Sequence, residues 1–139
     1  MSTGGSAIQR PLAVMMTRRI FAVAVSTRVV DAARILRDSK IGCLLVTSDE
    51  DHDRYIGIVS ETDLVRKVVA AEKDPSRILV SEVMTAPLIT IEIDRSAHDA
   101  SDLMAERGIR HLGITDNGRI VGMLSVRDLL RYFKNWGTT

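Results

Sequence analysis

The sequence has little of what would direct a protein to an oxidising compartment, a membrane or a polyanion. One cysteine among 139 residues cannot form an intrachain disulfide, which fits a reducing compartment. No run of about 18 apolar residues could cross a bilayer, and the N-terminus lacks the apolar stretch of a signal peptide. Nineteen basic and 18 acidic residues leave a formal net charge of +1, too little to attract nucleic acid or an anionic membrane. We therefore expect a soluble cytoplasmic protein with neither kind of partner.

What is present is the composition of a globular protein. Hydrophobic residues make up 45% and charged residues 27% of the chain, which is unlike a disordered protein. A chain of 139 residues corresponds to one domain or to two very small units that fold together. The cysteine, Cys43, stands in the apolar run "IGCLLV" and is expected to be a small core residue. Residues 1–10, with the polar stretch "STGGS", are expected to form a flexible leader.

The chain contains an internal repeat. Residues 31–47, "DAARILRDSKIGCLLVT", align with residues 99–115, "DASDLMAERGIRHLGIT", so that an aspartate-alanine pair, an isoleucine and a final threonine coincide. Farther on, "GIVSETDL" corresponds to "GMLSVRDL", and the copies differ in length only in the turn before this phrase, where insertions cost little. The inferred boundaries are repeats at 11–70 and 79–135, a charged linker at 71–78 and a tail at 136–139.

Each repeat has the same predicted order of elements, β-α-β-β-α. Near-continuous apolar strands at 41–46 and 109–114 follow a helix with apolar residues at helical spacing. The "DNG" sequence predicts a hairpin turn, and Ser96 with Asp99 predicts a capping box. One unit of this size leaves apolar surface exposed. We therefore predict an α+β (α/β-like) fold: two small three-stranded sheets, each covered by two helices, packed in pseudo-two-fold symmetry.

Both repeats end their last strand with a serine that is followed three residues later by an aspartate. These pairs are Ser60 with Asp63, and Ser125 with Asp128. Such a pair is typical of a helix start, because the serine caps a backbone N–H and the aspartate favours the positive end of the helix. The same place can hold a phosphate on free N–H groups, and a carboxylate can accept both hydroxyls of a ribose. The two interpretations are compatible.

The two copies together resemble the cystathionine-β-synthase (CBS) domain family, whose domains occur as tandem pairs. The second repeat carries the resemblance over nearly its whole length, through "VMTAP", "IRHL", "DNGRIVG" and "SVRDLL". The first repeat departs from the family pattern, with Arg19 in place of the proline at Pro87 and Gly42-Cys43 in place of an Arg-His pair. The resemblance implies a stand-alone pair that senses a ligand and does not catalyse a reaction.

The resemblance also implies what such a module binds. Many family members hold adenosine-containing ligands in two clefts between the repeats: AMP, ADP, ATP, S-adenosylmethionine or NAD-type dinucleotides. The serine then contacts phosphate and the aspartate contacts ribose, and apolar residues lie against the adenine. The cleft expected to be stronger comprises Ser60, Asp63, Met84, Ile109, Arg110 and His111. The other comprises Ser125, Asp128, Met16, Ile41 and Gly42, with Arg127 as a source of charge.

The two clefts are expected to be unequal, because only the first has a cation at the strand position. The predicted strand places Arg110 among apolar neighbours, where a charge needs a partner. That partner is either a ligand phosphate or an acidic neighbour such as Glu106. For His111 a structural, hydrogen-bonded role is favoured over a ligand contact, and the methionines are more often packing residues than ligand contacts.

Other chemistries have weak support. No nucleophile motif, phosphate-binding loop or paired-cysteine metal spacing occurs in the sequence. His98 and Asp102 could share a helix face and hold a metal, but a solvated face is favoured. The basic and aromatic stretches "RRIF" and "RYFKNW" would suit nucleic acid only with a basic stripe, which is missing.

Two hypotheses for function follow. The first is a regulatory module, acting as a homodimer, that binds an adenine nucleotide, requires no cofactor or metal, and signals to an unidentified regulated protein. The alternative is a protein-interaction or dimerisation module in which the Ser-x-x-Asp pairs only cap helices. An enzyme is not expected.

Overall fold

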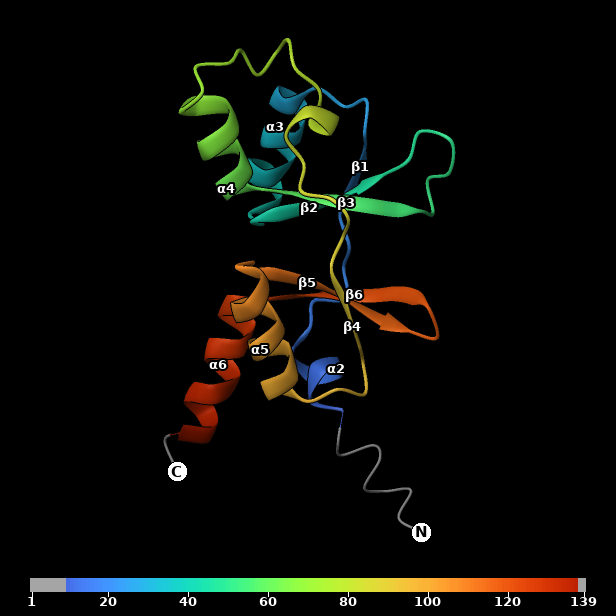
Figure 1. Ribbon diagram of the computed structural model, residues 1–139, viewed down its shortest axis with the longest axis vertical. Helices are drawn as coiled ribbons and strands as arrows, with labels where there is room; N and C mark the ends of the chain where they lie inside the picture. Colours follow the sequence, from blue (N-terminus) through green and yellow to red (C-terminus); the bar gives the residue numbers. More distant parts are fainter. Residues whose placement is uncertain (1–9, 138–139) are drawn as a thin grey trace. The chain divides into compact units, whose positions relative to one another are not determined.

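The apolar strands of the two repeats pair into two separate three-stranded sheets, with strand orders β1-β2-β3 and β4-β5-β6. A computed structural model describes residues 10–137 and divides into two units. One unit is the continuous segment Ile20–Leu88, and the other combines residues 10–19 with residues 89–137. In each unit the helices cover one face of the sheet (Figure 1). The predicted α+β class, with small three-stranded sheets and helices, is confirmed.

The unit Ile20–Leu88 follows the predicted order of elements and ends in an added turn. Its elements are β1 (Ala22–Ala24), α3 (Val29–Ser39), β2 (Cys43–Thr47), β3 (Tyr55–Ser60), α4 (Glu61–Leu64), the π-helical turn η1 (Val65–Val69) and the 3-10 turn η2 (Val80–Glu82). Strand β1 pairs parallel to β2, so α3 provides the crossover that a parallel pair requires. Strands β2 and β3 are antiparallel and joined by the longer hairpin.

The other unit repeats this arrangement and begins with a short helix from the start of the chain. Its elements are α2 (Pro11–Met15), β4 (Thr90–Glu92), α5 (Ala97–Arg107), β5 (His111–Asp116), β6 (Arg119–Ser125) and α6 (Val126–Gly137). Strand β4 is parallel to β5, and β5 is antiparallel to β6. The predicted "DNG" turn is confirmed, since Asn117 and Gly118 both have positive φ, at 53° and 80°.

Each unit has a hydrophobic core of its own between sheet and helices. In the unit Ile20–Leu88, Leu44 and Val46 of β2 face the same side because side chains alternate along a strand. They meet Val29, Ala32 and Leu36, which recur at helical spacing along α3. Full burial of a valine or leucine side chain contributes about 1.5–3 kcal/mol. The apolar periodicity therefore identified the buried face of this helix correctly.

The contacts group the chain differently from the sequence repeats. Residues 80–85, which begin the second repeat, pack onto the unit Ile20–Leu88, where Val80 and Val83 are part of the core. Residues 12–16, which begin the first repeat, pack onto the other unit, where Leu12 and Met16 are part of the core. The predicted boundaries at 11–70, 71–78 and 79–135 therefore describe sequence similarity. In the structure, the segment that begins each repeat, residues 12–17 or 80–85, packs with the rest of the other repeat, and we call these two segments the entering segments.

Two further expectations concern the ends of the chain. The predicted leader lies outside the described residues, apart from Arg10, and residues 138–139 of the predicted tail do so as well. Helix α6 continues through Gly137, so the helix extends into the first part of that tail. No helix within residues 10–137 is both long and apolar enough to cross a bilayer.

Candidate functional site

The glycine that opens "GIVSETDL" lies against the backbone of the entering segment. A Cβ on Gly57 would come within 2.7 Å of the Thr85 carbonyl oxygen and 3.2 Å of the Met84 sulfur. Ile58 and Thr85 exchange two backbone hydrogen bonds, of 2.9 and 2.7 Å, which hold this segment beside β3. Glycine is present here because the two backbones approach too closely for any side chain. Met84 and Thr85 are thereby positioned near the end of β3, where Ser60 lies.

The second phrase, "GMLSVRDL", is arranged in the same way in the other unit. A Cβ on Gly122 would lie 2.6 Å from the Met16 sulfur and 3.0 Å from the Thr17 carbonyl oxygen. Thr17 and Met123 exchange backbone hydrogen bonds of 2.8 and 2.9 Å. The Met-Thr pair of each entering segment therefore lies against the glycine of a Ser-x-x-Asp phrase. Met84 and Ser60 therefore belong to one unit and Met16 and Ser125 to the other, and their expected shared part in a ligand site stays a prediction.

Each Ser-x-x-Asp pair forms a reciprocal cap. The Ser60 N–H donates to Asp63 Oδ2 at 2.9 Å, and the Asp63 N–H donates to Ser60 Oγ at 3.2 Å. In the other unit the Ser125 N–H donates to Asp128 Oδ2 at 2.8 Å, and the Asp128 N–H donates to Ser125 Oγ at 3.1 Å. Capping as the structural role of these residues is confirmed. A part in ligand binding is compatible with it and stays a prediction.

The first-repeat carboxylate has further partners. Thr85 Oγ1 donates to Asp63 Oδ1 at 3.1 Å, and Lys67 Nζ lies 3.0 Å from the same oxygen. Ser60 Oγ lies 3.2 Å from Asp63 Oδ2 in addition to the backbone bond. The Lys67 ammonium also donates to the Val83 carbonyl oxygen at 3.0 Å. A network of charged and neutral donors thus joins the helix start to the entering segment.

The second-repeat carboxylate lacks an equivalent network. Lys67 follows Asp63 by four residues, and the residue four after Asp128 is Tyr132, which carries no cation. Among the residues that the structure describes, no side chain donates a hydrogen bond to Asp128, and its Oδ1 atom has no partner. The two phrases are alike in sequence, but the carboxylate of Asp63 has more hydrogen-bond and ion-pair partners than that of Asp128.

The residues expected from the strand before the hairpin lie near the Ser-x-x-Asp phrase of their own repeat. His111 pairs in register with Ser125, and the Val126 N–H donates to the Arg110 carbonyl oxygen at 2.8 Å. In the first repeat, the Glu61 N–H donates to the Gly42 carbonyl oxygen at 3.0 Å. The expected grouping of Arg110 and Ile109 with Ser60, and of Gly42 and Ile41 with Ser125, crosses between units and stays a prediction. Ile41 and Ile109 each pack against the core of their own unit.

The environment of Arg110 differs from the expectation. The strand was predicted over 109–114 but begins at His111, so Arg110 precedes β5 and is exposed. The strand pattern failed because the αL residue Gly108 ends α5 and the chain needs two more residues to enter the sheet. Within residues 10–137 no ion pair joins Arg110 to Glu106. Its guanidinium, like that of exposed Arg127, is therefore unpaired within this part of the chain.

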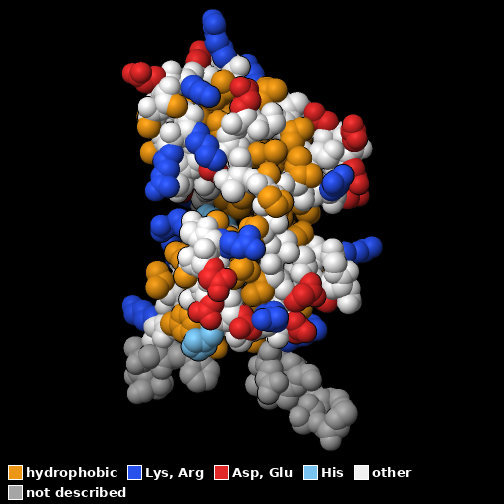
Figure 2. All heavy atoms as spheres, in the orientation of Figure 1, with side chains coloured by type: hydrophobic (Ala, Val, Ile, Leu, Met, Phe, Trp, Pro, Cys, Tyr) orange, Lys and Arg blue, Asp and Glu red, His pale blue; other side chains and the backbone are white. Residues whose placement is uncertain are grey.

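The weaker alternatives can also be located. The His98 ring contacts Phe133 edge to face, with centroids 5.1 Å apart, and no group of three or more metal-ligating side chains occurs among the described residues. On the face drawn in Figure 2, basic and acidic side chains are interspersed and form no basic stripe. Cys43 is mostly buried, and burial together with the charge of Glu61 raises the pKa of its thiol to about 12. This environment is in accord with the expectation that Cys43 is a small core residue.

Sequence reasoning missed two members of the site, Lys67 and Thr85. Lys67 stands in the π-helical turn η1, and it looks like any exposed lysine of the helix "DLVRKVVA". Thr85 belongs to the "VMT" stretch, from which only the methionine was selected. The one available signal was the spacing of four residues between Asp63 and Lys67, which favours an ion pair on a helix.

The two copies of this arrangement match a known family. The CBS domain is found at residues 12–70 and again at residues 80–135. The chain belongs to the CBS domain family. Its two copies form a tandem CBS pair. The entering segment of each copy packs in the unit that holds the rest of the other copy.

The chain is similar to several known proteins. A CBS-domain protein from Burkholderia ambifaria has a solved structure that is 36% identical, with a TM-score of 0.78, covering 84% of this chain and 83% of its own. An uncharacterised protein from Methanopyrus kandleri is 37% identical over 103 residues, 73% of this chain but only 52% of its own length. A CBS-domain protein from Pyrobaculum aerophilum, solved in complex with AMP, shares the fold at a TM-score of 0.78 and 24% identity, covering 91% of this chain and 98% of its own.

Proposed function

We propose that this CBS pair is a regulatory module that binds an adenine nucleotide, AMP, ADP or ATP, beside a Ser-x-x-Asp phrase. S-adenosylmethionine and NAD are the other adenosine ligands that belong in a test. The observation that carries the proposal is the Ser125 and Asp128 cap, where a helix N-terminus and a carboxylate lie beside an unpaired arginine, Arg110. The AMP complex of the Pyrobaculum relative supports the choice of ligand.

The chemistry of this edge suits a nucleoside phosphate. The dipole of α6 favours a phosphate at the helix start, where the Val126 and Asp128 N–H groups already donate to the Arg110 carbonyl oxygen and to Ser125 Oγ. A carboxylate accepts the two adjacent hydroxyls of a ribose through its two oxygens. Met16 packs against Gly122 with only 7% of its surface exposed, so contact with the base is not assigned to it. None of these groups supplies a nucleophile with a matching base, so the proposed role is sensing without catalysis.

A thermal-shift screen tests the proposal. The protein is melted alone and with AMP, ADP, ATP, S-adenosylmethionine and NAD, with guanosine monophosphate and inorganic phosphate as controls. A ligand at a hundredfold excess over its Kd stabilises the fold by about 2.7 kcal/mol, which raises Tm by several degrees. A rise with an adenine nucleotide alone supports the proposal, and no rise with any adenosine ligand refutes it.

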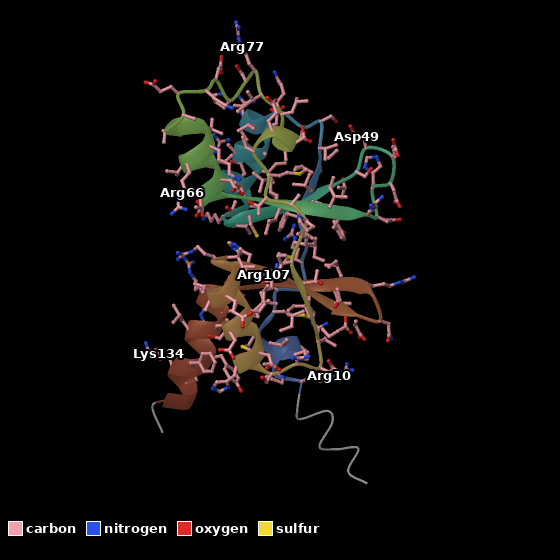
Figure 3. The ribbon with its side chains drawn as sticks, viewed as in Figure 1. Arg10, Asp49, Arg66, Arg77, Arg107 and Lys134 are labelled. Carbon is pink, nitrogen blue, oxygen red and sulfur yellow. The ribbon has the colours of Figure 1, made fainter. Side chains whose placement is uncertain are left out.

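The proposed phosphate contact has its own test. The affinity for AMP is compared with that for adenosine in the wild type and in Arg110→Ala. If Arg110 binds phosphate, the substitution removes most of the preference for AMP over adenosine and leaves adenosine binding unchanged. Arg107→Ala, on the exposed end of α5 and labelled in Figure 3, is the matched control and should keep the preference.

A second candidate function, an interaction module without a small ligand, is favoured by exposed apolar side chains. Val65 and Val69 of η1 are 59% and 72% exposed, and Leu130 of α6 is 65% exposed. Such residues on helices suit contact with another protein surface, including a homodimer. Light scattering of the purified chain, with and without AMP, separates the two. Oligomers that form independently of every nucleotide, together with a failed thermal-shift screen, would favour this alternative.

A further inference from the structure

The two Ser-x-x-Asp carboxylates occupy the same place in their repeats but are not equivalent as ligand-binding groups. We propose that only Asp128 accepts a ribose, and that Asp63 is a structural carboxylate closed to ligand by Lys67 and Thr85. This inference rests on the proposed function and adds that each chain binds one nucleotide, at the start of α6.

Asp63 has no acceptor position left. An ionised carboxylate offers about four lone-pair positions, two on each oxygen. Oδ1 receives Thr85 Oγ1 at 3.1 Å and lies 3.0 Å from Lys67 Nζ. Oδ2 receives the Ser60 N–H at 2.9 Å and Ser60 Oγ at 3.2 Å. A ribose that donates two hydroxyls to Asp63 would first have to displace two of these donors.

Displacement is opposed by the other contacts of Lys67. Its ammonium has three donors, and these also reach the Val83 carbonyl oxygen at 3.0 Å and Thr85 Oγ1 at 3.5 Å. The Asp63 side chain is only 9% exposed, whereas that of Lys67 is 44% exposed. Breaking the pair would leave a nearly buried carboxylate without its cation, which is more costly than breaking a pair on the surface. The pair therefore fastens the helix start to the segment that carries Val83 and Thr85.

The helical turn that carries Lys67 differs between the copies. After Asp63 the chain continues into the π-helical turn η1, where the Ala70 N–H donates to the Val65 carbonyl oxygen at 2.9 Å. Asp128, by contrast, stands in the α-helix α6, which runs without a π-helical turn from Val126 to Gly137. π-helical turns are rare and recur at functional positions. Here the turn holds the lysine that pairs with the carboxylate.

Asp128 is in the opposite condition. Its Oδ2 accepts the Ser125 N–H at 2.8 Å, and Oδ1 has no partner within the part of the chain that the structure describes. Arg110 and Arg127 are exposed near the start of α6, and neither forms an ion pair with a described residue. This edge thus offers an open carboxylate for ribose together with cations for phosphate. The proposed order of the sites is the reverse of the one expected from sequence, in which the Ser60 cleft is the stronger.

Calorimetric titration with AMP of the wild type, Asp128→Asn and Asp63→Asn tests the inference. Asparagine keeps an oxygen that can accept the serine N–H in both variants, so both substitutions preserve the helix cap and remove only the charge of the carboxylate. The wild type should bind one AMP per chain, and Asp128→Asn should weaken binding at least about tenfold, the loss of one charged hydrogen bond. Asp63→Asn should lower Tm and leave the AMP affinity within about threefold of the wild type.

A third variant tests the closure itself. Lys67→Met with Thr85→Val removes both donors to Asp63 Oδ1 at nearly constant volume, and a second AMP should then bind. Arg66→Met is the control, because Arg66 is an exposed neighbour that extends from the same helix in Figure 3 and should leave the stoichiometry at one.

The outcomes are distinct. Two AMP molecules per wild-type chain, an equal loss of affinity in Asp63→Asn and Asp128→Asn, or no second site after the double substitution would overturn the inference and leave the proposed function standing. No binding of AMP, ADP or ATP to any of the proteins would instead refute the proposed function. Melting curves of each variant identify any loss of affinity that is due to unfolding.

Discussion

The Thr85 carbonyl oxygen lies 2.7 Å from the position that a Cβ on Gly57 would occupy, and two hydrogen bonds to Ile58 hold it there. Gly57→Ala should therefore destabilise the fold by about 1–3 kcal/mol, the usual cost of overpacking. In Gly122→Ala the shortest contact, 2.6 Å, is with the sulfur of Met16, a flexible side chain that can turn away. The loss should be smaller. Urea unfolding of the two variants measures both, and a larger loss in Gly122→Ala would contradict this explanation.

The two copies end their first helix with different residues in the same conformation. Lys40 follows α3 with φ of 54°, and Gly108 follows α5 with φ of 62°. A side chain at positive φ is strained and glycine is not. Lys40→Gly should stabilise the protein by up to about 1 kcal/mol, and Gly108→Ala should destabilise it by a similar amount. Thermal melts of both variants give the comparison, and a destabilised Lys40→Gly would be the contrary result.

Cys43 should react slowly with thiol reagents. Burial first, and the charge of Glu61 second, raise the pKa of its thiol to about 12. Since only the thiolate reacts, alkylation at pH 8 should be roughly a thousandfold slower than for a free cysteine. Mass spectrometry after timed treatment with iodoacetamide measures this rate. The same reaction in guanidinium is the control, and equal rates in both conditions would show that the thiol is not held in this environment.

The cap of α5 should respond to acid. The hydrogen bond from Arg95, followed by that from the Ser96 N–H, lowers the pKa of Asp99 below its ordinary value. A lowered pKa in the folded state means that the ionised carboxylate stabilises the fold above the unfolded pKa of about 3.9. This contribution is lost as pH falls below that value through the lowered pKa.

Asp99→Asn measures the acid response. Its free energy of unfolding should fall less steeply with acid than that of the wild type. Asp102→Asn, on the same helix, is the matched control. Urea melts between pH 5 and pH 2.5 provide the comparison, and identical pH profiles for Asp99→Asn and the wild type would contradict the assigned cap.

The features that could be predicted from sequence are those with local causes. The turn at Asn117 and Gly118, the capping box of Ser96 with Asp99, and the buried face of α3 each depend on residues a few positions apart. The internal repeat predicted the order of elements, because two copies of one sequence pattern are expected to form the same strands and helices. Local chemistry and repetition together were sufficient for the fold class.

The features that could not be predicted depend on contacts between distant segments. Nothing in the residues near Gly57 shows that Thr85 will lie against it, because that approach joins segments far apart in sequence. The closure of Asp63 depends on the same segment, which supplies Thr85 and the Val83 carbonyl oxygen. The strand that follows α5 was predicted to begin at residue 109, two residues before its actual start at His111, because strand boundaries are set by pairing in the sheet. Arg110 was therefore wrongly placed inside the strand. The similarity of the two phrases in sequence thus did not reveal that the hydrogen bonding of their carboxylates differs.

Backbone amide NMR during a titration with AMP shows which of the two phrases binds the nucleotide, because it reports the bound site residue by residue. We expect the amides of Ser125, Val126 and Asp128 to shift and saturate with the ligand, together with that of Arg110. The amides of Ser60 and Asp63 should stay in place in the same titration. Saturating shifts centred on Ser60 and Asp63, or no shifts in either phrase with AMP, ADP and ATP, would contradict it.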